Sequence, residues 1–346
     1  MRTHDFEYHL PPELIAQTPL PERSASRLLV LDRAAGAVAH RHFTDLIDLV
    51  ASEDVLVLNA SRVIAARLLG KREGGSGMSG GPAELLLVGE HADGSWTAMG
   101  HPGGKLKPGR RVRFGPDSEV EILAVLGGGL RRVRFVGTLD AHATIAAYGT
   151  VPLPPYIRRA PTPDDRDRYQ TVYAEHDGSV AAPTAGLHFT SAALDTLRAK
   201  GAAIVTLDLH VGPGTFKPVE VEELSRHPMH AEAYEVSARA ATTINERRRA
   251  GGLVWAVGTT VVRTLETVAD ASGAIQAGRG ETALLIYPPY AFRAVDKLLT
   301  NFHLPRSTLL MLVCAFGGYE AVMRAYGEAV QRRYRFYSYG DAMAVI

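Results

Sequence analysis

The residues best suited to chemistry gather in four segments rich in histidine, threonine, glycine and amide side chains. Histidines and carboxylates carry protons near neutral pH, and glycine-threonine turns before a helix present backbone N–H groups to a ligand. Taken singly, each segment is also compatible with an ordinary helix cap or turn. The four segments are residues 181–190, 209–218, 257–266 and 300–309.

Two other segments carry side chains of the same kinds. His227, His230 and Glu232 could supply metal ligands, but Pro228 argues against a helix that would place both histidines on one face, so we expect no metal. Residues 334–343 contain four aromatic side chains, which predicts that this C-terminal segment is docked. Whether it lines a site or only seals the core stays open.

The elements that must position these segments alternate between strands and helices. This alternation predicts an α/β domain with a mostly parallel sheet, and such sheets bind ligands at the carboxyl ends of their strands. Strands are expected at 28–32, 54–59, 203–209, 253–257 and 283–286, and helices at 42–50, 191–200, 238–250, 260–270 and 319–332.

The middle of the chain differs in composition and in its pattern of apolar residues. After a glycine- and serine-rich stretch at 73–82, short strand patterns separated by turns predict a small β-barrel or sandwich. A strand pattern follows Gly127, Gly128 and Gly129, which indicates a hairpin turn and not a dinucleotide-binding loop. We therefore predict a mixed α/β main domain formed by residues 1–62 and 150–346, with a β-barrel-like domain inserted at 63–149.

Composition limits the class of protein. The length of 346 residues suits two domains, and the net charge of +1 excludes a general polycation but allows a local basic patch. The single cysteine, Cys314, lies in an apolar run and is expected in the core. There is no run near the roughly 18 apolar residues of a membrane span, and no apolar N-terminal stretch typical of a signal peptide. We expect a cytoplasmic protein.

In combination and in this order, the segments resemble the S-adenosylmethionine:tRNA ribosyltransferase-isomerase family of queuosine biosynthesis. The resemblance covers nearly the whole chain. One departure is Pro289, which stands where the family usually has glycine and lacks a backbone N–H donor. The matching segments are residues 14–17, 26–32, 59–63, 182–190, 209–219, 227–232, 257–266, 296–315 and 337–343.

The resemblance implies an enzyme for which S-adenosylmethionine is the ribosyl donor. The ribosyl part moves to the 7-aminomethyl group of a 7-deazaguanine at the wobble position of tRNA. It rearranges to an epoxycyclopentane, giving epoxyqueuosine, while adenine and methionine leave. The expected partner is therefore tRNA carrying the precursor base in its anticodon loop, with no metal, no membrane and a monomeric enzyme.

This chemistry needs a base for carbon 5′, an acid for the departing adenine and a site for a sulfonium cation, which aromatic faces and carboxylates hold well. The candidates for proton transfer are His188, His210, His303, Glu232 and Asp341, with His188 or His210 as the base. The candidates for substrate binding are Thr184, Gly186, Phe189, Gly212, Thr215, Thr259, Thr260, Arg263, Asn301, Phe302, Ser307, Tyr337 and Tyr339.

Four arginines just upstream of the first segment, Arg158, Arg159, Arg166 and Arg168, are the candidates for tRNA contact. Three other functions remain open. A metal-dependent hydrolase would use the histidines and Glu232. An ordinary methyltransferase is a second alternative, although no Gly-x-Gly-x-x-Gly follows a predicted strand. A non-enzymatic RNA-binding module would leave the four segments unexplained.

Overall fold

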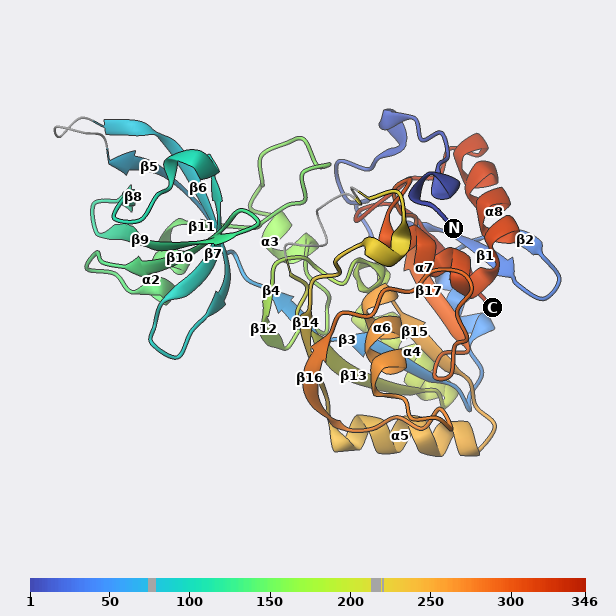
Figure 1. Cartoon of the computed structure of the whole chain (residues 1–346). Coiled ribbons are helices and arrows are strands. Elements are labelled where there is room, and N and C mark those ends of the chain that lie inside the picture. Colours follow the sequence, from blue (N-terminus) through green and yellow to red (C-terminus); the bar gives the residue numbers. More distant parts are fainter. Residues whose placement is uncertain (74–78, 213–218, 220) are drawn as a thin grey trace.

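Two β-sheets dominate the computed structural model, which describes residues 1–73, 79–212, 219 and 221–346 (Figure 1). The larger sheet has nine strands in the order β16-β14-β13-β3-β15-β17-β18-β1-β2. In chain order these strands are β1 Arg27–Asp32, β2 Ala37–His42, β3 Val55–Asn59, β13 Ala203–Leu209, β14 Glu232–Val236, β15 Val254–Val257, β16 Gly278–Thr282, β17 Lys297–Asn301 and β18 Ala342–Val345.

The centre of this sheet is parallel and its flanks are not. Strands β13, β3, β15 and β17 run parallel to one another. Strands β14 and β16 extend the sheet antiparallel on one side. On the other side β18 pairs antiparallel with β17 but parallel with β1, and β2 pairs antiparallel with β1. The mixed α/β class is confirmed, while a mostly parallel sheet is found only at the centre.

One predicted strand, at 283–286, is wrong. The strand in this region is β16, which ends at Thr282 and pairs with β14 although its sequence Gly-Arg-Gly-Glu-Thr lacks an apolar pattern. The apolar run after it leaves the sheet, and Ile286 packs into the core. A run this short satisfies a strand pattern equally well whether or not it finds a pairing partner.

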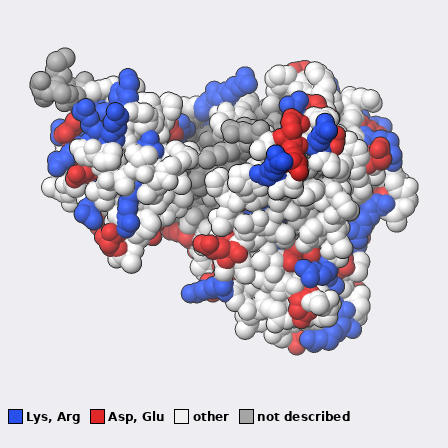
Figure 2. Space-filling view, in the orientation of Figure 1, with Lys and Arg blue, Asp and Glu red and all other residues white. Residues whose placement is uncertain are grey.

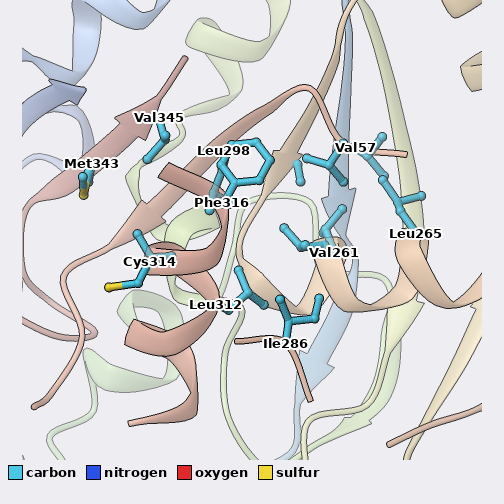
Figure 3. Close-up of a cluster of buried hydrophobic side chains, with 14 of the residues drawn as sticks. Val57, Val261, Leu265, Ile286, Leu298, Leu312, Cys314, Phe316, Met343 and Val345 are labelled. Atoms are coloured by element: carbon cyan, nitrogen blue, oxygen red, sulfur yellow. The ribbon is translucent and has the colours of Figure 1, made fainter. Parts of the chain in front are cut away.

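Helices cover both faces of the nine-stranded sheet. Because side chains alternate along a strand, Val57 of β3 points into one hydrophobic cluster and Leu56 into another on the opposite face. Figure 3 shows part of the first cluster, which includes Val57, Val261 and Leu298. The helices are α1 Leu46–Leu49, α2 Ala141–Tyr148, α3 Asp165–Arg168, α4 Ser191–Lys200, α5 Ala238–Arg249, α6 Thr259–Val268, α7 Thr308–Gly317 and α8 Tyr319–Gln331.

Cys314 lies on α7 inside the first cluster, as expected (Figure 3). It is 1% exposed, and burial raises the pKa of its thiol to about 12. Among the described residues no single helix is long and apolar enough to cross a membrane. Helices α7 and α8 reach that length only as a pair, and the chain bends by 117° between them.

The C-terminal segment is docked, as its aromatic content predicts. Strand β18 is buried along its whole length between β17 and β1. Just before it, Tyr334 and Phe336 pack against Phe302 with ring centroids 5.5 Å and 5.0 Å away. The segment therefore completes the core, and the site described below shows that part of it also lines a cavity.

The second sheet forms the predicted barrel, which lies beside the larger sheet (Figure 1). Strand β5 pairs with both β6 and β8, so six strands close in the order β5-β6-β7-β10-β9-β8, and β11 adds to β5. Gly127, Gly128 and Gly129 form the hairpin between β9 and β10, all with positive φ. The strands are β5 Arg67–Glu73, β6 Ser79–Glu90, β7 Trp96–His101, β8 Arg111–Gly115, β9 Ser118–Gly127, β10 Leu130–Phe135 and β11 Gly149–Thr150.

A short two-stranded sheet connects the two larger ones. It pairs β4 (Ser61–Val63), which follows β3, in parallel with β12 (His176–Ser179). The 3-10 helix Thr184–His188 comes soon after β12 and leads into α4. This short sheet therefore fixes the start of the segment 181–190 next to the end of β3.

Candidate functional site

A cavity of about 1050 Å³ lies beyond the carboxyl ends of β13, β15 and β17. This is the edge at which α/β sheets bind ligands. All four chemistry-rich segments contribute to its wall, through residues such as Ala182, Val211, Thr260 and Asn301. Side chains that are far apart in sequence are therefore brought together as the sequence pattern predicts.

The cavity wall separates the predicted site residues into two groups. Ten of them line it: Thr184, Glu232, Thr259, Thr260, Arg263, Asn301, Phe302, His303, Ser307 and Tyr337. Seven others lie outside its lining: Gly186, His188, Phe189, His210, Gly212, Tyr339 and Asp341. Thr215 falls outside the described residues.

Among the three histidines predicted to transfer protons, His303 lines the cavity, whereas His188 and His210, the two predicted as the base, do not. His303 follows β17, and its Nε2 lies 2.8 Å from the hydroxyl of Thr300. The backbone N–H of His303 donates to the hydroxyl oxygen of Tyr326 at 3.1 Å. Burial lowers the pKa of His303 to about 3. The ring is therefore neutral near pH 7, and the lowered pKa makes it a weaker base than a free imidazole.

His188 lies behind the cavity wall. Its Nδ1 is 2.8 Å from the hydroxyl of Ser26, and its ring stacks on Phe43 at a centroid distance of 5.1 Å. Burial lowers its pKa to about 4, against the opposing effects of Asp341 and Asn301. It lines a separate small pocket that also includes Arg23.

Glu232 and Arg263 form a buried ion pair in the cavity wall, with side chains 5% and 8% exposed. Arg263 also donates from Nε to the carbonyl of Leu284 and from Nη2 to that of Thr282, at 3.0 Å and 3.2 Å. Glu232 accepts from the backbone N–H of Gly212 at 3.0 Å. The pair thus holds α6, β14 and the residues after β16 together.

The N-terminus of α6 points its first residues at the cavity. Gly258 has φ +95°, a backbone conformation that is unfavourable for residues with a Cβ atom. It turns the chain from β15 directly into the helix. Thr259 and Thr260 follow and line the wall. Below them, Asn59 ties the end of β3 to β13, with Nδ2 donating to the carbonyl of Leu209 at 3.0 Å. A helix start in this position favours polar or anionic groups of a ligand.

Two stacked tyrosines form an aromatic wall. The rings of Tyr156 and Tyr337 have centroids 4.0 Å apart, and Tyr156 shares a hydrogen bond of 2.5 Å with the hydroxyl of Ser338. Asn301 Nδ2 donates to the carbonyl of Tyr337 at 2.9 Å, which fixes the tail against β17. Aromatic faces of this kind attract cations.

Phe189, Tyr339 and Asp341 make contacts that stabilise the fold. Phe189 packs edge-on against Phe43 in the second hydrophobic cluster. Tyr339 donates to Asp165 at 2.7 Å. Asp341 accepts from the backbone N–H of Arg27 at 2.9 Å and pairs with the guanidinium of the same residue at 3.0 Å.

His210 and Gly186 also have packing partners. A Cβ at Gly178 would lie 2.6 Å from Nδ1 of His210, so the imidazole sits directly against that glycine. A Cβ at Gly186 would lie 2.0 Å from the hydroxyl of Tyr173. The contact with Tyr173 explains why residue 186 is glycine.

The four predicted tRNA-contacting arginines differ in how they are held. Arg159 forms a two-pronged ion pair with Asp165, at 2.6 Å and 2.7 Å. Arg168 donates to the carbonyls of residues 20 and 21, and Arg166 donates to that of residue 149. Arg158 is exposed, and within the described part of the chain its guanidinium has no hydrogen-bond or ion-pair partner.

The sequence interpretation missed part of the lining. Tyr156 was not singled out, although the Pro154-Pro155-Tyr156 sequence is a signal for a rigid turn with an aromatic side chain. Leu284, Leu285 and Ile286 were assigned to a strand but form an apolar wall. His227 and His230 line the cavity with Glu232, while the described residues contain no group of three or more His, Cys, Asp or Glu side chains placed to hold a metal.

Comparison with known proteins identifies the family. The profile of the family described as "Queuosine biosynthesis protein" matches residues 3–345. The chain belongs to this family. It is 50% identical to the S-adenosylmethionine:tRNA ribosyltransferase-isomerase of Symbiobacterium thermophilum, with 100% of each chain covered, and 53% identical to that of an Anaeromyxobacter strain, with 99% and 98% covered.

A solved structure supports the same relationship. The crystal structure of the S-adenosylmethionine tRNA ribosyltransferase from Thermotoga maritima has 38% sequence identity to this chain. It aligns with a TM-score of 0.57 over 99% of this chain and 100% of that one. The family's fold is therefore shared over the full length.

Proposed function

We propose that the protein transfers and isomerises the ribosyl part of S-adenosylmethionine onto the 7-aminomethyl-7-deazaguanine at the wobble position of tRNA. The product is epoxyqueuosine in tRNA, and adenine and methionine are released. The observation that carries this proposal is identity of about half of the residues, over the full chain, with enzymes named S-adenosylmethionine:tRNA ribosyltransferase-isomerase. The enzyme is expected to act as a monomer in the cytoplasm, where tRNA is available.

The size and lining of the cavity support this reaction. Pockets for single small molecules usually measure about 300–1,000 Å³, so a cavity of about 1050 Å³ offers room for S-adenosylmethionine together with a base turned out of the anticodon stack. Tyr156 and Tyr337 offer faces to the sulfonium. Thr259 and Thr260, at the start of α6, offer donors to hydroxyl groups.

Among the five candidates for proton transfer, we assign the base that removes a proton from carbon 5′ to His303. It lines the cavity, whereas His188 and His210 lie outside the lining. Glu232 also lines the cavity, but its contacts with Arg263 and Gly212 suit a positioning role. Asp341 pairs with Arg27 and lies outside the cavity lining.

This assignment is tested by single-turnover kinetics on folded variants. Loss of a general base typically costs about 10²–10⁴-fold in rate, and we expect at least the lower value for His303→Gln. The double variant His188→Gln/His210→Gln is the comparison. A full rate with His303→Gln, or a larger loss in the double variant than in His303→Gln, contradicts the assignment.

The reaction itself is tested by its small-molecule products. The protein is incubated with S-adenosylmethionine and tRNA that carries the 7-aminomethyl-7-deazaguanine, and the supernatant is analysed for purines. We expect adenine, formed only when that tRNA is present. S-Adenosylhomocysteine instead of adenine would indicate a methyltransferase and would overturn the proposal.

A further inference from the structure

The barrel reaches the cavity through its β9–β10 hairpin. Gly128, at the tip of that hairpin, lines the cavity together with residues of the α/β part. The barrel is thus part of the rim of the cavity, and the barrel surface next to this hairpin is available to a ligand that enters the cavity.

The turn that follows β7 lies at the same end of the barrel as this hairpin. Strands β7 and β10 are antiparallel, with Met99 opposite Leu130, so the end of β7 adjoins the start of β10. Arg131, which is 6% exposed, fixes the turn by donating to the carbonyls of Gly103 and Leu106 at 2.6 Å and 2.9 Å. A buried guanidinium used in this way gives the turn a defined position next to the cavity rim.

This turn carries cations that have no acidic partner in the described part of the chain. On the face of the barrel shown in Figure 2, Lys and Arg side chains are spread out with Asp and Glu among them. Arg111 and Arg113 pair with Glu119, and Arg132 and Arg134 pair with Asp93. Lys105 and Lys107 are exposed, and neither ammonium group has an ion-pair partner among the residues that the structure describes.

We propose that Lys105 and Lys107 form a phosphate-binding surface for the tRNA strand that flanks the wobble base. The inference rests on the proposed function, because an anticodon base that enters the cavity brings its neighbouring phosphates to the rim. Unpaired lysines bind phosphates by releasing counterions and position the RNA without reading its sequence. Arg158, exposed and two residues beyond the cavity-lining Tyr156, supplies a cation on the α/β side of the same rim.

The test measures the affinity of the full-length protein for tRNA carrying the precursor base across a range of salt concentrations. The variant Lys105→Gln/Lys107→Gln removes two positive charges. Arg111→Gln/Arg113→Gln removes the same charge from a paired site on the same barrel and is the matched control. We expect roughly tenfold weaker binding for the lysine variant at low salt, and a log–log salt slope smaller by about 1.4–1.8, that is, about 0.7–0.9 per lost phosphate contact.

The outcomes separate this inference from the proposed function. Unchanged affinity and slope for the lysine variant, or an equal loss in the arginine control, would overturn the assigned surface. Adenine release is followed in parallel with the unaltered protein. If that protein binds tRNA but forms no adenine, the proposed reaction fails, whereas adenine formation with normal binding by the lysine variant rejects only the phosphate-binding surface.

Discussion

At the scale of residues, the residue types and their order in the sequence predict which segments come together. They do not predict which side chains in those segments line the cavity. His188 and His303 both lie in polar loops beside apolar runs. Only the path of the backbone separates them, since His303 enters the cavity and His188 packs on Phe43 behind it. Arg263 shows the same limit, because its position near a helix start suggests ligand binding while its N–H groups bind Glu232 and two carbonyls.

The two buried histidines predict how stability depends on pH. Their pKa values of about 4 and about 3 lie below the ~6.5 of a free imidazole, so the unfolded chain binds more protons than the folded one as the pH falls below that value. Their contribution is complete above about pH 6.5. It is lost towards pH 4 at about 1.4 kcal/mol per pH unit for each histidine.

Urea unfolding between pH 4 and 7 checks this dependence. We expect His188→Gln and His303→Gln each to reduce the slope of unfolding free energy against pH by about 1.4 kcal/mol per unit. His9→Gln, at an exposed position, serves as the control. A slope that is the same in all three variants and in the unaltered protein would show that neither imidazole is held neutral by the fold.

At the scale of elements, the strands and helices with strong patterns are predicted well. The helix expected at 319–332 is α8, Tyr319–Gln331, and the strand expected at 28–32 is β1, Arg27–Asp32. The strands β14 and β18 were missed. Strand β14, Glu-Ala-Tyr-Glu-Val, has charged residues at two of its five positions and pairs with β13 and β16, while β18 is buried on both faces and lacks alternation. The domain boundaries at residues 63 and 149 stay a prediction.

The 3-10 helix Thr184–His188 depends on a close contact that its sequence does not reveal. A Cβ at Gly186 would meet Tyr173 Oη at 2.0 Å and Thr171 Cγ2 at 2.8 Å. Overpacking of this kind costs about 1–3 kcal/mol, so we expect Gly186→Ala to lower the free energy of unfolding by that amount. Because Thr184 on this helix lines the cavity, the affinity for S-adenosylmethionine should fall as well.

A double variant separates this steric cause from a general loss of flexibility. The hydroxyl of Tyr173 is buried and has no hydrogen-bond partner within the described part of the chain, so Tyr173→Phe alone should change stability little. Combined with Gly186→Ala, it removes the nearest clashing atom and should recover part of the lost stability. A double variant that is as unstable as Gly186→Ala alone would contradict the contact.

At the scale of the whole molecule, the site depends on segments from nearly the full chain. The cavity takes residues from the barrel hairpin, the turn around Tyr156, the ends of three parallel strands and the C-terminal segment. The sequence predicts that ligands bind at this edge of an α/β sheet. It does not predict that Gly128 of the barrel would join them, because that contact depends on how the barrel is placed against the larger sheet.

The central claim is that the ribosyl part of S-adenosylmethionine, and not its methyl group, is transferred to tRNA. The most direct measurement uses S-adenosylmethionine labelled with ¹⁴C in the ribose and ³H in the methyl group, incubated with the protein and precursor-modified tRNA. We predict that ¹⁴C appears in the tRNA and that ³H is recovered in free methionine. Transfer of ³H to the tRNA, or tRNA without ¹⁴C while S-adenosylmethionine is consumed, would contradict it.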